Sequence, residues 1–229
     1  MNWTLLDEQW QQRHDPAVFS ELETALDSAL WNSKGTPEYP LLWRWARLSH
    51  FRAMQSLEKN GSSEAARLHF EAAAQEAETA CEVQPNLVEG HFWFGVCHIE
   101  AARTRGKLAA ARALSKASAH IDRAANIDEA YHFAGPLRVQ ARFTHLRPLL
   151  LGGSLDRSLD IYRRALQIAP HNSTTLLYYA EALIADQDWK PTRRTLHQII
   201  NAPPDKCWIW EQTRDRRLAT ELLASLDAR

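Results

Sequence analysis

The pattern of apolar and polar positions along the chain contains no clear period-two alternation, which is the mark of a half-buried strand. Residues that favour helices dominate instead, and the helix breakers Pro, Gly and Asn fall between the helix-forming runs. The pattern therefore predicts an all-α chain. We expect eleven helices, over residues 3–13, 16–31, 40–58, 62–83, 87–104, 107–126, 130–146, 154–168, 173–186, 189–201 and 206–226.

The connections between these helices are short and carry recognisable loop signals. Asp15-Pro16 has the form of a helix N-cap followed by Pro at the first helical position. Gly152-Gly153 is expected to hold a backbone turn that a Cβ would disturb, with Gly153 at positive φ. Because short connections place consecutive helices side by side, we expect antiparallel neighbours. Loops are predicted at residues 32–37, 60–62, 85–86, 148–154, 170–172 and 201–204.

The clearest repeat signal is the segment Ser158–Pro170, which matches the second helix of a tetratricopeptide repeat (TPR). In this pattern a small residue lets two helices approach, an aromatic or apolar side chain fills the gap between them, and Pro ends the helix. These matches favour a solenoid of helix pairs, with an irregular helical bundle as the alternative. The four matches are Ser158-Tyr162-Ala165-Pro170, Thr192-Leu196-Ile199-Pro204, Ala117-Ile121-Ala124 with Glu129 in place of Pro, and Ala73-Ala77-Ala80-Pro85.

The predicted fold is an all-α, TPR-like right-handed solenoid of antiparallel helix pairs, forming a single domain over residues 1–229. The N-terminal helices (1–36) and the C-terminal helix (206–226) are expected to cap this array. Five of the nine tryptophans lie in the first 45 residues, and bulky aromatic side chains can seal the ends of a repeat array. The alternative is that these tryptophans form a partner-binding surface, where Trp is favoured.

A groove is expected on the concave face of the solenoid, lined by the first helix of each repeat. Its lining is mostly apolar and has almost none of the Lys, Arg and Asn side chains that bind acidic peptide ends, so it favours an apolar helix, an apolar peptide or a lipid-like molecule. The alternative is that the N-terminal helices or insertions fill it as core. The predicted groove residues are Trp43, Arg47, His50, Phe92, Val96, Ile99, Phe133, Gln140, Phe143, Leu177 and Glu181. We expect a cavity lined by at least three of Trp43, Phe92, Phe133, Phe143 and Leu177.

Four short motifs add a family resemblance. They are Pro85–Val96, Gly135–Arg138, Leu151–Ser154 and Cys207–Glu211. In this order they resemble the TRAP transporter T-component family of TPR-like proteins, over residues 15–226. The resemblance implies an exported, all-helical, non-catalytic module that associates with other proteins, in some cases as an oligomer with an apolar cavity.

Charge and composition exclude several function classes. The chain has 27 basic and 28 acidic residues, so no overall field would hold nucleic acid, and the arginine pairs alternate with acids as on a solvated helix face. No apolar run is long enough to span a membrane. With eight glycines, only two of them adjacent, the chain lacks a phosphate-binding loop, and no catalytic motif is complete. We therefore predict a non-enzymatic protein, with an enzyme on a helical scaffold as a remote alternative.

Cysteine and histidine spacing predicts neither a metal site nor a cofactor. The three cysteines form no C-x-x-C pair, and we expect reduced, mostly buried thiols. His91 and His98 are seven residues apart, with Cys97 beside His98. Ligands on one helix normally lie four residues apart, so this group does not predict a metal site.

Two functional hypotheses follow. The first is a non-catalytic protein-interaction module that binds a protein or peptide through an apolar groove. The alternative is an apolar-ligand-binding accessory component of a TRAP-type solute uptake system. Self-association stays open in both. The first eight residues lack a basic stretch and a long apolar stretch, so as written the chain is expected in the cytoplasm, or in the periplasm if a leader has been removed.

Overall fold

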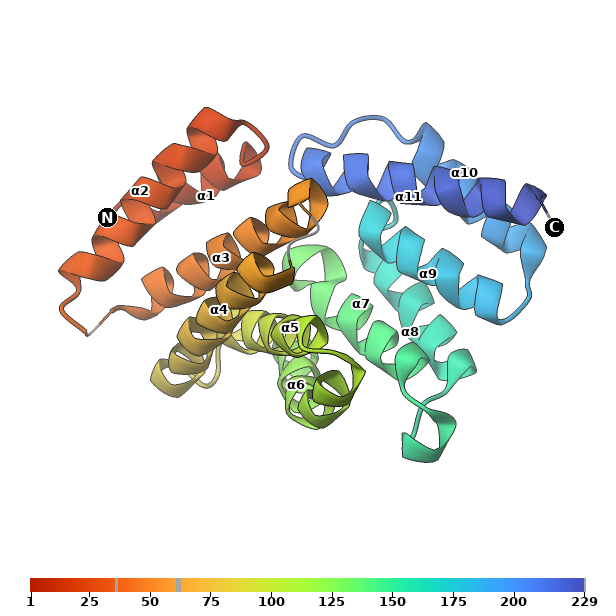
Figure 1. The fold of residues 1–229 in the computed structure, drawn as a ribbon, viewed down its shortest axis with the longest axis horizontal. Coiled ribbons are helices and arrows are strands. Elements are labelled where there is room, and N and C mark those ends of the chain that lie inside the picture. The colour runs from red at the N-terminus through yellow and green to blue at the C-terminus, as the bar shows by residue number, and fades with distance from the viewer. Residues whose placement is uncertain (36, 61–62, 229) are drawn as a thin grey trace.

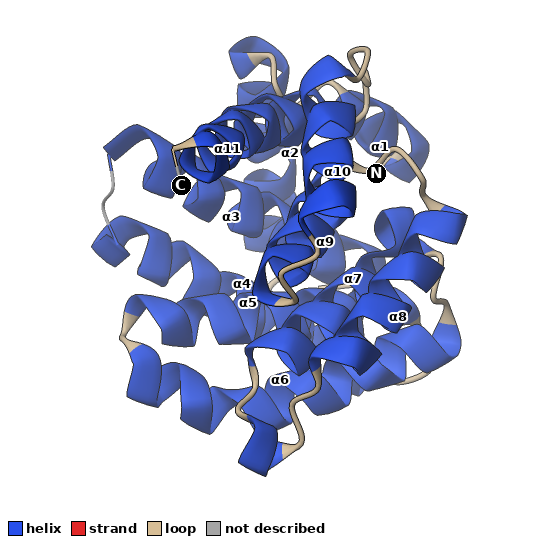
Figure 2. Cartoon of the chain, turned by 90° about the vertical axis from the view of Figure 1, so that its right-hand side faces the viewer, coloured by secondary structure: helices blue, strands red, loops and turns tan. Residues whose placement is uncertain are grey.

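The computed structural model describes residues 1–35, 37–60 and 63–228, and every regular element in this part of the chain is helical (Figures 1 and 2). It contains one 3₁₀ turn, η1 (Leu149–Leu151). The α-helices are α1 (Trp3–Gln11), α2 (Pro16–Asn32), α3 (Tyr39–Asn60), α4 (Ser63–Val83), α5 (Val88–Thr104), α6 (Lys107–Ile127), α7 (Tyr131–Leu146), α8 (Leu155–Ile168), α9 (Ser173–Ala185), α10 (Trp189–Asn201) and α11 (Ile209–Asp227).

The eleven predicted helices are all present, and most of their ends lie within one residue of the prediction. The largest difference is at α11, which begins at Ile209 because residues 205–208 form a turn. Its bonds are Cys207 N–H to Asp205 Oδ1 at 2.9 Å and Trp208 N–H to the Asp205 carbonyl at 3.0 Å. Positions 61 and 62 of the predicted 60–62 loop lie outside the described residues.

Local capping signals explain several helix starts. The Asp15 side chain accepts a hydrogen bond from Ala17 N–H at 2.8 Å, and Pro16 is the first residue of α2, as predicted. Asn172 caps α9 in the same way, through a 3.0 Å bond from Thr175 N–H. These helix ends therefore depend on residues close to them in sequence.

The helices form a TPR-like right-handed solenoid of antiparallel pairs, which Figure 1 shows as an arc with α1–α2 at one end and α10–α11 at the other. Consecutive helices make the main contacts from α3 to α11. In addition α3, α5, α7 and α9 contact one another in series, so the first helix of each pair belongs to one layer. This layer is where the groove was predicted.

The small and apolar positions of the predicted repeats are the contacts between paired helices. Ser158 Oγ, for example, donates to the Ala141 carbonyl of α7 at 2.9 Å, so α8 lies directly against α7. The twelve non-terminal residues of the four matches are all fully buried: Ala73, Ala77, Ala80, Ala117, Ile121, Ala124, Ser158, Tyr162, Ala165, Thr192, Leu196 and Ile199.

The start of α7 departs from regular helix geometry. His132, Phe133 and Ala134 have φ of 51°, 59° and 56°, in the left-handed region, and Pro136 follows within the helix. Residues with a Cβ adopt this conformation at a cost of about 1–2 kcal/mol each. The turn directs His132 and Phe133 toward Trp208 of the C-terminal segment, with ring centroids at 5.2 and 5.1 Å.

Candidate functional site

The predicted wall, by which we mean Trp43, Phe92, Phe133, Phe143 and Leu177, lies mostly in the protein interior. The structure buries four of these side chains, and Phe92 is only 2% exposed, whereas Phe133 is 41% exposed. Trp43, Phe92 and Phe143 share one core cluster, while Leu177 belongs to a second cluster, with α10 and α11. The expectation that these side chains line an open apolar cavity is therefore wrong for those four.

Other parts of the chain cover the wall. The guanidinium of Arg44 lies 4.0 Å from the centre of the Trp43 ring, and Asp7 of α1 holds that guanidinium through a 2.5 Å ion pair. Phe92 packs edge-on against Tyr131 at the start of α7, with ring centroids 5.4 Å apart. The N-terminal helices contribute to this cover through Asp7, as the stated alternative expects, whereas Phe92 is covered by the neighbouring helix α7.

The remaining predicted groove residues are buried or half-buried, and several have partners within the chain. Arg47 pairs with Asp7 at 2.9 Å, Gln140 donates to Asp122 at 2.7 Å, and Glu181 pairs with Arg142. The side chains of Ile99, Val96 and His50 complete the set: Ile99 is buried, and the other two are half-buried.

Trp208 closes the inner side of the solenoid. It lies in the connection before α11 and is buried against His132 and Phe133, while the neighbouring Trp210 packs on Phe51 with ring centroids 5.0 Å apart. The C-terminal segment thus covers the inner layer of helices as well as the last repeat. Its covering role was not visible in the sequence, because the contacts join residues about 75 to 160 positions apart.

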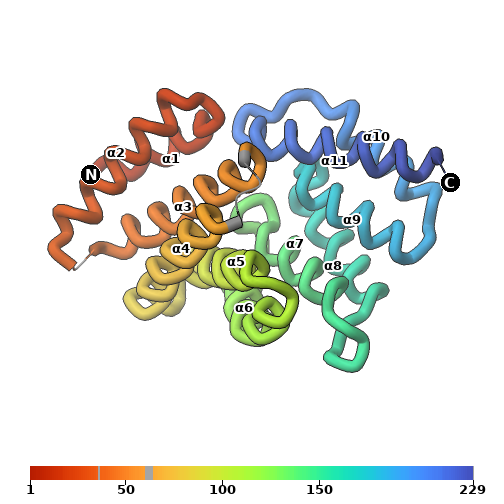
Figure 3. Tube along the Cα trace, viewed as in Figure 1, coloured from red at the N-terminus to blue at the C-terminus, as the bar shows by residue number. Residues whose placement is uncertain are grey.

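An ion pair joins the two ends of the chain. Arg13, 3% exposed, donates through Nη2 to both Oε atoms of Glu211 at 2.7 Å, and through Nη1 to the Cys207 carbonyl at 2.9 Å. Figure 3 shows the N-terminal helices approaching the segment that leads into α11. Removing one partner of a buried, multiply hydrogen-bonded Arg–carboxylate pair strongly destabilises the folded protein, because it leaves the other charge buried without a partner. This contact therefore stabilises the packing of the two chain ends against each other.

The interior near this contact is basic. Arg138 is buried, and no carboxylate oxygen of the described residues lies within ion-pair distance of it; its Nη1 donates to the Phe133 carbonyl at 3.2 Å. Burial lowers the pKa of His50 to about 3, helped by the charges of Arg214 and Arg138. Burial, with the charge of Arg138, also holds the pKa of His132 well below its usual value. Both imidazoles are therefore neutral at physiological pH.

The most exposed apolar surface lies between α7 and α8. We call Leu146, Leu149, Leu150 and Leu151 the leucine knuckle; all four are exposed, and Leu150 is 97% exposed. Figure 1 shows this segment projecting from the body of the solenoid. A monomeric protein rarely leaves several large apolar side chains exposed next to one another in the chain. The signal in the sequence is the run of three leucines inside the loop predicted over residues 148–154.

The knuckle has a defined backbone. Gly153 N–H donates to the Pro148 carbonyl at 3.1 Å, and Ser154 N–H donates to the Thr144 carbonyl at 3.2 Å. The predicted turn is present, but the positive φ, 86°, belongs to Gly152. Gly153 is required for another reason: a Cβ there would lie 1.8 Å from the Arg147 carbonyl oxygen. The leucines are thus presented on a closed turn.

Comparisons with known proteins give one family and a distant structural similarity. The model of a family described as TRAP transporter T-component matches residues 40–224. A search of curated proteins finds no match. Among solved structures, the crystal structure of yeast Tom70 is similar with a TM-score of 0.34 and 11% identity, over 97% of this chain and 58% of that chain. Within the described residues, no helix combines the length and apolar character that a membrane span requires.

Proposed function

The chain belongs to the TRAP transporter T-component family, and we propose that it is a protein-interaction component of a TRAP-type solute uptake system. The family and the helical architecture support a non-catalytic module. In this proposal the chain binds another protein of the system and does no chemistry on the solute. The role goes with the exported location that the family resemblance implies, so we propose the periplasmic alternative.

The leucine knuckle is the observation that carries the interaction role. Burying one leucine side chain contributes about 1.5–3 kcal/mol, so covering Leu149, Leu150 and Leu151 supplies a concentrated binding energy. The hydrogen bonds across the base of the turn order the backbone before binding, which lowers the entropy cost of association. The partner that matches this surface is a protein with an apolar groove.

The structure shifts the choice between the two hypotheses formed from the sequence. An apolar small molecule was expected to bind the predicted wall, and four of the five wall residues are core. The residue-level argument for an apolar ligand is therefore lost. A role in the uptake system through protein contacts keeps its support from the family and from the knuckle.

The test is a binding measurement between the purified full chain and the other purified subunits of the system. We expect Leu149→Glu with Leu150→Glu to weaken binding at least ~10-fold, since one buried leucine alone accounts for that factor. Leu108→Glu is the matched control, because Leu108 is a 66% exposed leucine at the start of α6. Far-ultraviolet circular dichroism should be unchanged in both variants.

Two results would overturn the proposal. One is unchanged subunit binding in the double variant. The other is binding of the wild-type chain, but not the double variant, to phospholipid vesicles without any subunit, which would make the knuckle a membrane contact.

A further inference from the structure

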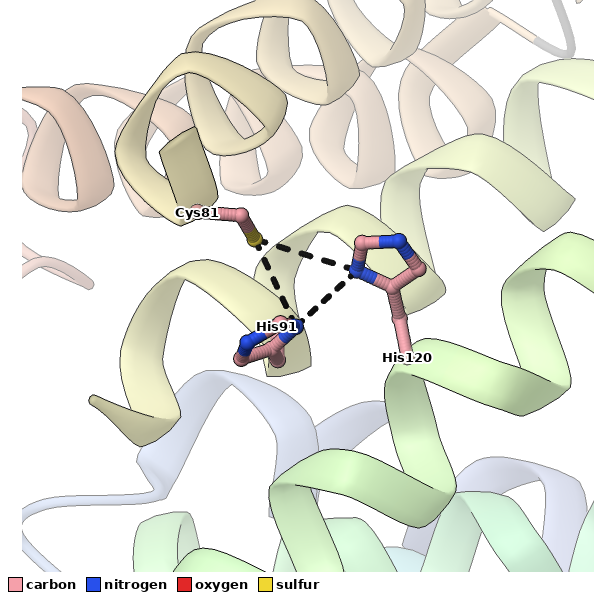
Figure 4. Close-up of side chains that lie close together, drawn as sticks. All are labelled: Cys81, His91 and His120. Atoms are coloured by element: carbon pink, nitrogen blue, oxygen red, sulfur yellow. Dashed lines mark hydrogen bonds between the residues drawn. The ribbon is translucent and has the colours of Figure 1, made fainter. Parts of the chain in front are cut away.

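Three potential metal ligands converge from three successive helices, at a place unrelated to the predicted wall and to the knuckle. They are Cys81 near the end of α4, His91 in the first turns of α5 and His120 in α6 (Figure 4). Cys81 Sγ lies 3.6 Å from His91 Nδ1 and 3.7 Å from His120 Nδ1, and the two Nδ1 atoms are 3.1 Å apart. The three atoms thus form one small triangle.

This triangle has the dimensions of one face of a zinc tetrahedron. With Zn–S of about 2.3 Å and Zn–N of about 2.0–2.1 Å, tetrahedral angles place S and N about 3.5 Å apart and the two N atoms about 3.4 Å apart. The observed separations of Cys81, His91 and His120 differ from these by no more than about 0.3 Å.

The hydrogen bonding of His91 directs its free nitrogen into the triangle. His91 Nε2 lies 3.0 Å from the Pro85 carbonyl oxygen, which can only accept, so Nε2 carries the proton. Nδ1 then presents its lone pair toward Cys81 and His120. In metal-bound imidazoles, the ring N–H that does not face the metal usually donates to a backbone carbonyl, a carboxylate or water, and this bond fixes the orientation of the ring.

Packing brings the ligands this close and holds them there. A Cβ at Gly90 would lie 3.2 Å from Cys81 Sγ and 3.1 Å from the Cys81 backbone nitrogen, so glycine allows α5 to approach α4. On the other side, the Phe94 ring lies 4.2 Å from the His120 ring, centroid to centroid. These contacts restrict the motion of two of the three ligands.

The three side chains are accessible from one side. A cation that binds Cys81 replaces the thiol proton, because the thiolate is the form that ligates a metal. Cys81 and His91 are buried and His120 is half-buried, which leaves the approach on the His120 side.

We propose that Cys81, His91 and His120 bind one Zn²⁺ ion, with the fourth coordination position filled by water or by a ligand from a partner. One thiolate and two imidazoles are ligands that Zn²⁺ prefers, and three protein ligands with one open position are typical of zinc sites that are not purely structural. Sequence spacing did not predict this site, because each ligand lies on a different helix.

The test uses the full chain, stripped of metal with a chelator and kept reduced with a phosphine. Addition of Co²⁺ should produce the intense visible bands of tetrahedral cobalt and a thiolate-to-cobalt charge-transfer band, at one ion per chain. One equivalent of Zn²⁺ should abolish these bands and raise Tm. Cys81→Ser should remove the charge-transfer band, because it removes the thiolate. His120→Gln should weaken Co²⁺ binding at least ~10-fold, since loss of a residue that only hydrogen-bonds to a metal ligand already has an effect of that size.

Matched variants separate this site from nonspecific binding. Cys97→Ser removes another buried cysteine, and His98→Gln removes another histidine of α5; both should bind Co²⁺ as the wild type does. Circular dichroism checks that all variants are folded. The proposal is overturned if the wild type binds less than one equivalent, or if Cys81→Ser and Cys97→Ser behave alike. In that case the triangle is a hydrogen-bond network between the three side chains.

Discussion

The predicted wall and the leucine knuckle are both built from large apolar side chains, but the chain buries four of the five wall residues and leaves the knuckle in solvent. Phe92 lies beneath the start of α7, and Trp43 lies beneath arginines that α1 holds in place. Leu150 has no such cover. Both regions are apolar, and they differ in whether another segment of the chain packs over them. An apolar stripe on a repeat helix therefore identifies a binding groove only when no other segment of the chain packs over it.

The largest effect that tests this comparison is the truncation of a wall residue. Phe92→Ala should lower the free energy of unfolding by about 3–5 kcal/mol, because it leaves a cavity in the core. Urea denaturation followed by circular dichroism measures this change. A loss below about 1 kcal/mol would mean that Phe92 faces open space, and the wall would again be a candidate groove.

Next in size is the ion pair that joins the chain ends. Arg13→Ala should cost about 3 kcal/mol, since it leaves Glu211 without its partner in a largely buried place. Arg217→Ala is the control: its pair with Glu58 also joins distant segments but is exposed, so it should cost less than about 1 kcal/mol. Equal effects of the two substitutions would show that burial of the Arg13 pair does not matter.

A smaller effect is expected at the base of the knuckle. Gly153→Val should cost about 1–3 kcal/mol, because its Cβ would collide with the Arg147 carbonyl and force the turn to open. Gly152→Asn should be much milder, since Asn tolerates the left-handed conformation found at that position. Thermal unfolding of both variants compares them, and the reverse order would contradict the geometry described for the turn.

The smallest effect is expected at the tip of the knuckle. Leu150→Ala should change the free energy of unfolding by no more than about 0.5 kcal/mol, because its side chain is 97% exposed. The same urea titration used for Phe92→Ala measures it. A stability loss comparable to that of Phe92→Ala would show that the knuckle folds back onto the protein in solution.

The helices and their pairing could be predicted from the sequence because the signals are local. Asp15 and Pro16 start α2 through contacts within three residues. Ser158, Tyr162 and Ala165 lie on one face of α8 by helical spacing alone, so their burial against α7 follows from the repeat pattern. Each of these features depends on residues within one or two turns of a helix, and sequence spacing describes that range well.

The surfaces could not be predicted in the same way, because long-range contacts decide them. Trp208 covers the inner layer because the solenoid curves until Arg13 meets Glu211. Cys81, His91 and His120 come together because the three helices that carry them pack against one another. The left-handed turn at His132 is disfavoured locally and persists because Trp93, Phe92 and Trp208 pack around its ring. Local propensity thus sets which residues are helical and which face each helix buries. Tertiary packing sets which apolar and polar groups stay accessible, since that depends on segments far apart in the chain.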